Sequence, residues 1–498
     1  MKANMLEYLE ETANRVPERI AFCDDRESLS FAGLMENAKK IGSCLAKHTA
    51  PRDPVALLID ARSLSNIPAM FGVLYAGCAY APLDIAMPPE RLRLLLELLQ
   101  PTALLVDERG KKAYESCGLD GDCLITCSDA LSCDINEEKL GIIRNQASVY
   151  DPMSILYTSG STGSIQTHFS YLHWTEATIK VYGLTEDAVF GNQSPFFYAN
   201  SILDVYPPVA LGARTYLLPS GVLTFPKKLI ESLNKQHITV FCMTPSSFIS
   251  VVNAGVLKPG CLPELKWGMM SGESMPWLPL KVWMEASPHA SWWHFYGSTE
   301  MFAVAVGTVG EDHQDGDRLP VGKPFSLVHI LFVDENGNEV PPGVPGEMLV
   351  SSPWISSGYH RDAERTAASW VTDPLNQGWY ERFFRGGDIG FIREDGQLMV
   401  LGRRDTQIKH LGYRMEIGEV EVALRELPGW RAGCVLFDSE KDKLWCFYTG
   451  ELEEKEIIAG LKERLARNML PDFYVHLGEM PYTATMKLDR SRLRKMMV

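Results

Sequence analysis

The stretch of this sequence best suited to chemistry is residues 154–163, which read SILYTSGSTG. The apolar run Ile155 to Tyr157 is followed by seven residues that are all Thr, Ser or Gly. This pattern predicts a buried strand that ends in a loop with little side-chain bulk, free backbone N–H groups and several hydroxyls. A polyphosphate needs such a loop, because the backbone must approach it closely and donate to it. The loop is not of the Walker type, since no Gly-Lys-Ser/Thr follows at the required spacing, and an ordinary turn is the alternative interpretation.

The bulk properties limit the kind of protein that this can be. With 498 residues, 46% of them hydrophobic and 22% charged, the chain has the composition of a soluble globular protein of about two to four domains. Its formal net charge of −15 offers no basic stripe for a phosphate backbone. We therefore expect no nucleic-acid partner.

The cysteines and the first residues predict a cytoplasmic protein. The eleven cysteines are scattered without CxxC pairs, which indicates free thiols in a reducing compartment. Cys117, Cys123, Cys127 and Cys133 are close in sequence, but their irregular spacing and the lack of a neighbouring histidine argue against zinc. The N-terminal residues do not read as a signal peptide. No apolar run reaches the length of a membrane span, so we expect no membrane partner.

Short apolar strands alternate with helical segments in the first part of the chain. Helices are expected at 5–13, 29–45, 67–76 and 88–100, strands at 54–60 and 102–107, and an extended segment at 79–84. The alternation of strands and helices continues through 237–245. Such alternation indicates a buried parallel or mixed sheet. Residues 321–352 and 388–405 each predict an antiparallel hairpin, the second with Asp395-Gly396 at its turn. The tail predicts a small α+β unit, with helices at 416–427 and 453–467 and two strands between them.

Seven motifs follow one another along nearly the whole chain. They are LSFAGL, LYAGCAYAPLD, YTSGSTG, YGSTE (296–300), RGGDIG, GRRDTQIKHLGYRMEIGEVE and TATMKLDR. In this order they resemble the motifs of the acyl-adenylating enzymes, which include acyl-CoA synthetases, firefly-type luciferases and the adenylation domains of nonribosomal peptide synthetases. The DVYP element at 204–207 is more similar to D-alanine–carrier-protein ligases and amino-acid adenylation domains than to fatty acyl-CoA synthetases.

The resemblance implies an α/β fold with two domains. A large N-terminal adenylation domain, residues 1–404, would combine mixed sheets and helices with a β-barrel-like part. A small, mobile α+β domain would follow at 405–498, with Asp405 as the hinge. Its rotation would bring a loop with Lys409, Gly412 and Arg414 to the active site for the second half-reaction.

The resemblance also assigns roles at an ATP and Mg²⁺ site. Attack of a carboxylate on the α-phosphate of ATP brings two anions together, so the site must neutralise charge. Lys487 would bridge the two anions, Glu300 and Thr162 would hold magnesium, Tyr296 would stack on adenine, and Asp388 with Arg403 would bind the ribose. The other nucleotide-binding candidates are Thr158, Ser159, Gly160, Ser161, Gly163, Gly272, Glu273, His294, Phe295, Gly297, Ser298 and Thr299. Each has an ordinary alternative: Glu300 or Lys487 as a surface charge, Tyr296 as core and Asp388 as a turn residue.

Several positions depart from the family pattern. Ile165, Gln166 and Thr167 stand where Pro-Lys-Gly is usual, which removes a positive charge near the leaving pyrophosphate. Met486 replaces the usual Gly before the terminal lysine, and His294 and Ser298 replace Asn and Pro. We expect the lost lysine to slow adenylation without abolishing it.

Another departure concerns the substrate. Alignment on the DVYP element places Ala199 where amino-acid-activating members carry the Asp that pairs with the substrate ammonium. A buried ammonium without its carboxylate would be several kcal/mol worse off. The remaining pocket candidates are uncharged: Asn200, Leu203, Ser246, Met269, Ser271, Phe295, Ala303 and Val304. Such a lining suits an apolar or aryl acid without an α-amine. Asn200, Ser246 or Ser271 could form a hydrogen bond with one polar substituent of that acid. The alternative is that these positions are ordinary core residues.

We therefore predict a ligase that converts a carboxylic acid and MgATP to acyl-AMP and passes the acyl group to the phosphopantetheine thiol of a separate carrier protein, with CoA as the second choice of acceptor. One alternative is an amino-acid ligase in which Asp204 or a backbone carbonyl holds the amine. The other is a homologue that binds but does not turn over, suggested by Gln166 and Met486. Against it, Glu300, Asp388, Arg403 and Lys487 occur together, as the chemistry requires.

Overall fold

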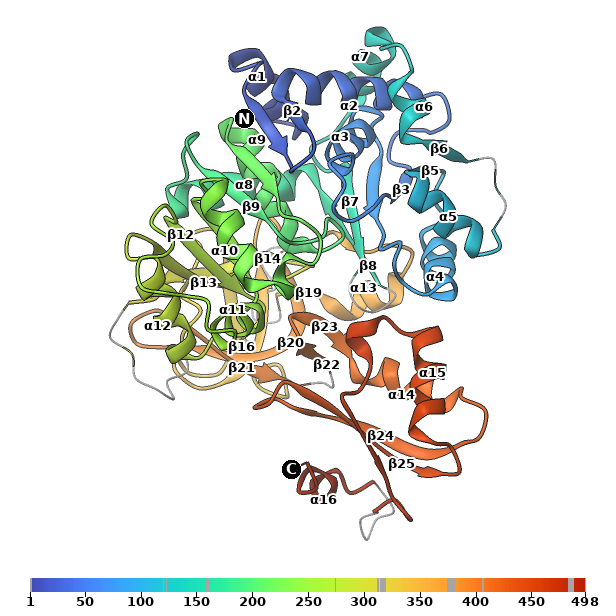
Figure 1. The fold of residues 1–498 in the computed structure, drawn as a ribbon, viewed down its shortest axis with the longest axis vertical. Coiled ribbons are helices and arrows are strands. Elements are labelled where there is room, and N and C mark those ends of the chain that lie inside the picture. Colours follow the sequence, from blue (N-terminus) through green and yellow to red (C-terminus); the bar gives the residue numbers. More distant parts are fainter. Residues whose placement is uncertain are drawn as a thin grey trace.

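The structure is a computed structural model that describes residues 2–119, 121, 123–157, 162–273, 275–310, 313, 319–373, 381–404, 407–481 and 488–497. Two large sheets dominate it (Figure 1). The nine-stranded sheet has the order β15 (Lys323–Pro324), β14 (Phe302–Thr308), β13 (Ser291–Ser298), β12 (Trp267–Ser271), β11 (Val240–Met243), β9 (Val189–Asn192), β10 (Arg214–Leu217), β1 (Ile20–Cys23) and β2 (Ser28–Ser30). Six of its strands, β13 to β1, are parallel, while β2 is antiparallel to β1, β14 to β13, and β15 to β14.

The seven-stranded sheet has the order β18 (Gly358–Tyr359), β8 (Gly163–Thr167), β7 (Pro152–Tyr157), β4 (Ala79–Pro82), β3 (Pro54–Leu58), β5 (Ala103–Val106) and β6 (Leu124–Thr126). Its strands are parallel from β7 to β6. Strand β7 leads into the Ser/Gly-rich loop and β8 returns antiparallel from it, so the loop joins two neighbouring strands. The strands expected at 54–60 and 102–107 are confirmed by β3 and β5, and the extended segment expected at 79–84 contains β4.

Helices cover both sheets. The largest core is shared by residues of the two sheets and by α1 (Leu6–Arg15), α2 (Phe31–Leu45), α3 (Asn66–Tyr75), α8 (His168–Tyr182) and α9 (Tyr206–Leu211). A second core packs the nine-stranded sheet against α10 (Pro226–Lys235), α11 (Pro245–Asn253) and α12 (Trp277–Ala286), and a third packs the seven-stranded sheet against α4 (Pro89–Leu99) and α5 (Glu108–Ser116). Shorter helices are α6 (Cys127–Leu131), α7 (Glu137–Gln146), η1 (Ala199–Asp204) and η2 (Val222–Thr224).

Local sequence explains where these helices begin. Ser30 accepts a hydrogen bond from the N–H of Gly33 at the start of α2, and Thr167 does the same for Ser170 at the start of α8. In α4 a proline occupies the first turn, where its missing N–H costs nothing.

The antiparallel part predicted after residue 321 is a five-stranded sheet. Its order is β16 (His329–Val333), β17 (Gly346–Ser351), β20 (Arg382–Ile392) and β19 (Trp370–Thr372), with β21 (Leu398–Arg403) paired to β20. The two predicted hairpins correspond to β16–β17 and β20–β21. Helix α13 (Ala363–Ser369) lies between β18 and β19.

The residues after 406 build cores of their own. They form the hairpin β22 (Gln407–His410) and β23 (Tyr413–Glu416) and the sheet β24 (Trp430–Asp438), β25 (Lys443–Gly450) and β26 (Phe473–His476). Helices α14 (Ile417–Arg425) and α15 (Glu454–Arg464) pack on this sheet, followed by η3 (Arg467–Met469) and α16 (Arg490–Arg494). In Figure 1 this part lies below the large sheets, with β22 and β23 at the junction. A domain boundary at 404/405 stays a prediction, because residues 405 and 406 lie outside the described ranges.

Within those ranges, no helix combines the length and apolar character needed to cross a membrane.

Candidate active site

A cavity of about 290 Å³ opens where the large sheets meet the hairpin β22–β23. Its wall comes from the ends of β4, β7, β12 and β13, from the start of β14, from η1 and from α8. The hairpin contributes Lys409, Leu411, Gly412 and Tyr413, and η3 contributes Asn468 and Met469. The cavity is therefore lined by segments far apart in the sequence, from Pro82 to Met469.

Six of the nine predicted substrate-pocket residues line this cavity: Ala199, Asn200, Leu203, Ser271, Phe295 and Ala303. The other three do not, and each has a structural reason. Met269 is fully buried in the main core, two residues before Ser271 on the same strand. Val304 points to the opposite side of β14 from Ala303, into a different core. Ser246 is occupied with Glu273, which accepts from its backbone N–H at 2.8 Å and from its hydroxyl at 3.2 Å.

Glu300 is fully buried in a pocket of hydroxyl groups. Its two carboxylate oxygens accept from the hydroxyls of Ser298, at 2.8 Å, and Tyr359, at 2.9 Å. Ser164 lies opposite Tyr359 in the β8–β18 pair, and the N–H of Ser356 donates to the backbone oxygen of Glu300. The side-chain oxygens of Ser164 and Ser356 are buried and have no hydrogen-bond partner among the described residues. Hydroxyl and carboxylate oxygens are the hard ligands that magnesium prefers, but Glu300 itself does not line the cavity.

The loop predicted to bind phosphates is described only at its end. Thr158, Ser159, Gly160 and Ser161 lie outside the described residues. Thr162 is described, and its hydroxyl accepts from Nη1 of Arg365 at 3.0 Å. Gly163 begins β8, and its carbonyl accepts from the N–H of His360.

Gln166, which occupies the place of the usual lysine, faces the same buried region. It is fully buried, and its Nε2 donates to the backbone oxygen of Thr299 at 2.9 Å. Its Oε1 is buried without a partner among the described residues. Gln166 thus ties β8 to the 296–300 motif and cannot supply the missing charge.

The residues predicted to bind adenine surround Tyr296. Gly272, Phe295, Gly297, Ser298 and Thr299 line the cavity. Tyr296 is buried, and the ammonium of Lys409 lies 5.9 Å from the centre of its ring. His294 is fully enclosed, with its two ring nitrogens close to the backbone oxygens of Pro320 and Glu273, and burial lowers its pKa. In this arrangement the hairpin, through Lys409, occupies one side of the ring expected to stack on adenine.

The two predicted ribose residues form one pair. Nη1 of Arg403 lies 3.2 Å from Oδ2 of Asp388, across the β20–β21 ladder, and both side chains are mostly buried. Arg403 also donates to the backbone oxygen of Gly386. Arg403 thus holds the carboxylate of Asp388 in place, and neither residue lines the cavity.

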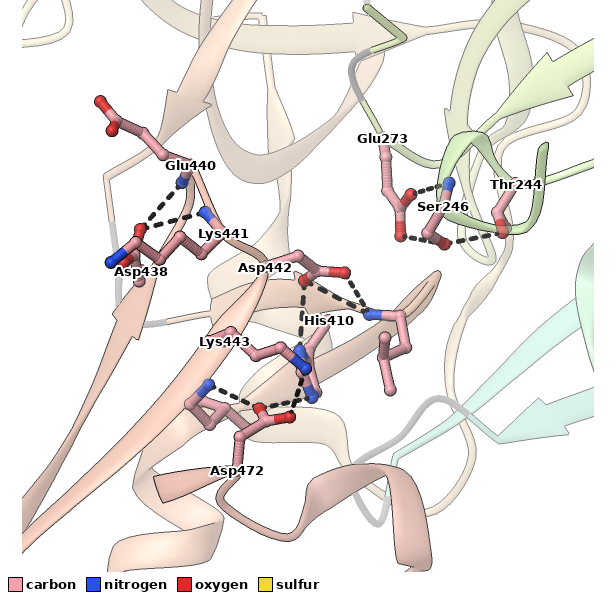
Figure 2. Close-up of polar contacts among 12 residues, drawn as sticks. Thr244, Ser246, Glu273, His410, Asp438, Glu440, Lys441, Asp442, Lys443 and Asp472 are labelled. Carbon is pink, nitrogen blue, oxygen red and sulfur yellow. Dashed lines mark hydrogen bonds and ion pairs between the residues drawn. The ribbon is translucent and has the colours of Figure 1, made fainter. Parts of the chain in front are cut away.

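The hairpin is anchored to the small sheet through His410. Its Nδ1 lies 3.1 Å from Oδ1 of Asp442 and its Nε2 lies 3.5 Å from Oδ2 of Asp472, and the side chain is only 2% exposed. Asp442 also accepts from the N–H of Leu411, and Asp472 pairs with Lys443 at 2.7 Å. Figure 2 shows the His410 ring between the two carboxylates, with Glu273, Ser246 and Thr244 on the facing side of the junction. Burial raises the pKa of Glu273, with a smaller contribution from Asp442.

Two of the predicted residues at this end of the chain cannot be located. Asp405 and Lys487 lie outside the described residues, and of Arg414 only the backbone is described. The described residues next to Lys487, Pro481 and Leu488, do not line the cavity. Leu488 instead packs on the core formed by β24 and β25.

Sequence reasoning overlooked several cavity residues. Trp174, Thr178 and Tyr182 reach the cavity from successive turns of α8, which reads as an ordinary core helix. Asp84 is the one carboxylate among the described lining residues, and burial raises its pKa. Its place at the end of the extended segment predicted at 79–84 was the signal in the sequence that could have identified it. Asp204, the alternative amine partner, is fully buried, bonded by Asn192 at 3.0 Å, and does not line the cavity.

The fold and the motifs together agree with known proteins. The pattern of the family described as "AMP-binding enzyme" matches residues 9–360. D-alanine–D-alanyl carrier protein ligase of Bacillus velezensis is 28% identical over 519 residues, which cover 98% of each chain. Bacitracin synthase 1 of Bacillus licheniformis is 28% identical over 98% of this chain, but the chain spans only 9% of that protein. The solved structure of IdnL1 superposes with a TM-score of 0.83 at 24% identity, covering 96% of this chain and 99% of that one.

The chain belongs to the AMP-binding enzyme family. It is accordingly an acyl-adenylate-forming ligase, which confirms the class of enzyme and the fold that the seven motifs indicate.

Proposed function

We propose that this ligase activates a carboxylic acid without an α-amino group, apolar or aryl in its acyl part, and transfers it from acyl-AMP to the phosphopantetheine thiol of a separate carrier protein. The observation that carries the substrate proposal is the wall of the cavity. Ala199 lines it at the position where the sequence comparison expects the amine-binding carboxylate. The lining nearby is aromatic and aliphatic, with Trp174, Tyr182, Phe302 and Leu203.

A buried ammonium needs a partner of opposite charge, because an unpaired charge in such surroundings costs several kcal/mol. Asp204 does not reach the cavity and is already bonded to Asn192. Asp84 does reach it, on a wall that it shares with Tyr198 and with Tyr413 of the hairpin. Asn200 and Gln193 are neutral, so they suit a hydroxyl or carbonyl substituent of the acid.

ATP, when bound, would supply the leaving pyrophosphate, and magnesium would neutralise charge on its phosphates. Glu300 would hold the ion, since the hydroxyls of Ser298 and Tyr359 fix the orientation of its carboxylate. Asp388, oriented by Arg403, is suited to accept hydrogen bonds from the ribose. Lys487 would neutralise the approaching carboxylate and α-phosphate.

A thiol acceptor is supported by the position of the hairpin. Lys409, Gly412 and Tyr413 line the cavity. This position of the hairpin is the one expected for the second half-reaction, the transfer of the acyl group to a thiol. Similarity to a carrier-protein ligase over nearly its full length favours a carrier protein over CoA.

ATP–pyrophosphate exchange with a panel of aryl, aliphatic, α-amino and β-amino acids tests the first step. We expect signal from acids that lack an α-amine. Signal from an α-amino acid alone would reject the substrate proposal and favour Asp84 as the amine partner. Nucleotide binding without exchange for any acid would favour a binding-only homologue.

The acceptor is tested separately, by mass spectrometry of a holo-carrier protein and of CoA after incubation with the accepted acid and MgATP. Acylated carrier is the expected product. Formation of acyl-CoA alone would reject the carrier proposal.

A further inference from the structure

The phosphate loop of this chain contains no positive charge of its own. Residues 154–167 include no Lys, Arg or His. The triphosphate of ATP and the pyrophosphate that leaves are polyanions, and their stabilisation in phosphoryl and adenylyl transfer is chiefly electrostatic. Glu300 adds a fully buried negative charge close to the loop. The proposed function already assigns magnesium and Lys487 to the phosphates and the reacting carboxylate, and a cation from another element of the chain would further stabilise the leaving pyrophosphate.

Arg365 is placed to be that cation. Strand β18 pairs with β8, so α13, which follows it, begins beside the end of the loop. From the first turn of α13, Nη1 of Arg365 donates to the hydroxyl of Thr162 at 3.0 Å, across 203 positions of sequence. A planar guanidinium has five N–H donors, so this contact leaves others for phosphate oxygens.

The other contacts of Arg365 do not hold it elsewhere. Its Nε lies 3.6 Å from Oδ2 of Asp362, a loose pair between residues one turn apart, and its side chain is 55% exposed. Asp362 also caps α13, where its Oδ1 accepts from the N–H of Arg365 at 2.9 Å. The neighbouring Arg361 is instead bonded to the side chain of Gln100.

We propose that Arg365 binds the β- and γ-phosphates of ATP and the pyrophosphate product, in place of the lysine that this phosphate loop lacks. The inference rests on the proposed adenylation function, because it assumes that the loop ending at Thr162 holds the triphosphate. If Arg365 supplies the positive charge, the residue at position 166 can be neutral, and Gln166 forms a buried hydrogen bond to the backbone oxygen of Thr299 instead.

Isothermal titration calorimetry of the full chain with ATP and with AMP, both in magnesium chloride, tests the assignment without any acid substrate. Arg365→Ala should weaken ATP binding about tenfold or more, because a charge-assisted hydrogen bond to phosphate is lost. AMP carries no β- or γ-phosphate, so its affinity should change by less than about twofold under the same reasoning. Arg365→Lys should restore most of the ATP affinity. Arg93→Ala is the matched control, since Arg93 pairs with Glu97 on the exposed side of α4.

Unchanged ATP affinity in Arg365→Ala would overturn the proposal, and so would an equal loss for ATP and AMP, which would indicate a structural role in α13. Product inhibition by pyrophosphate provides a second readout, which should weaken in Arg365→Ala if exchange is measurable. Failure of the wild-type chain to adenylate any acid, with the ATP-specific loss intact, would reject the proposed function and leave Arg365 as a triphosphate-binding residue.

Discussion

The ring of Tyr413 packs against the ring of Tyr198, with their centres 5.0 Å apart and their planes inclined by 51°. Tyr198 precedes η1 on the cavity wall, and Tyr413 starts the second strand of the hairpin. Burial is the main cause that raises the pKa of both phenols. The contact helps to hold the hairpin at the cavity. Substitutions that displace the hairpin should therefore affect transfer of the acyl group to the thiol, the step that we assign to it.

Gly412 provides the sharpest test of the hairpin. Its φ is +83°, a conformation that side chains rarely adopt, and a Cβ there would lie 2.6 Å from Cγ2 of Thr244. Gly412→Ala should push the hairpin away from Thr244. We expect thioester formation to fall at least about tenfold, equivalent to roughly 1.4 kcal/mol. Pyrophosphate exchange should change little, because Gly412 serves the second half-reaction. Quenched-flow measurement of acyl-AMP formation and of carrier acylation separates the two steps.

Gly418 is a matched control for that substitution, because a Cβ at this position of α14 meets no atom within 4 Å. Gly418→Ala should leave both steps unchanged. An equal loss of adenylation and thiol transfer in Gly412→Ala would show that the hairpin does not act on the second step selectively.

His410 should stabilise the small domain and orient the hairpin. In His410→Ala, Asp442 and Asp472 would face each other without the ring between them. We expect a loss of about 1–3 kcal/mol in stability, as for other buried donors whose removal leaves acceptors unpaired. Carrier acylation should also slow at temperatures where the variant is fully folded. His410→Asn, which can still donate to one carboxylate, should recover part of both.

Thermal melting and acylation rates measure the two effects of His410. His237→Ala provides the comparison, since His237 pairs with Glu264 on the exposed surface. If His410→Ala melts as the wild type does, or keeps the full acylation rate while folded, the corresponding role is rejected.

Asp204 predicts a pH dependence of stability. Burial raises its pKa to about 7, against the hydrogen bond from Asn192, which lowers it. The folded state therefore holds the proton more tightly than the unfolded state, whose carboxyl titrates near its ordinary value of 3.8. The stabilisation is complete below that value and is lost as the pH rises toward 7, by at most about 1.4 kcal/mol per pH unit.

Asp204→Asn removes this titration and keeps an oxygen that can accept from Asn192. The melting temperature of Asp204→Asn, relative to that of the wild type, should be higher at pH 8 than at pH 5. A difference between the two proteins that stays constant over this range would mean that Asp204 does not titrate there. Differential scanning calorimetry at both pH values makes the comparison.

The order of elements could be read from the sequence because it depends on local patterns. Apolar runs such as those of β3 and β5 form strands that are buried on both faces, and Ser30 caps α2 through a contact three residues away. The seven motifs also identify the family, since they depend only on residue type and order. Ala199 lies on the cavity wall, and its role in substrate recognition stays a prediction.

The tertiary structure decided what depends on contacts between distant segments. Met269 and Ser271 point to the same side of β12. Only Ser271, at the end of the strand, reaches the cavity, because Met269 is packed in the main core. The sequence alone shows that Gln166 is neutral where a lysine is usual. Its buried contact with Thr299 and the contact of Arg365 with Thr162 depend on the tertiary structure, in which β8 pairs with β18. Sequence patterns extend over a few residues, whereas these contacts join segments more than 130 positions apart and exist only once the sheets have formed.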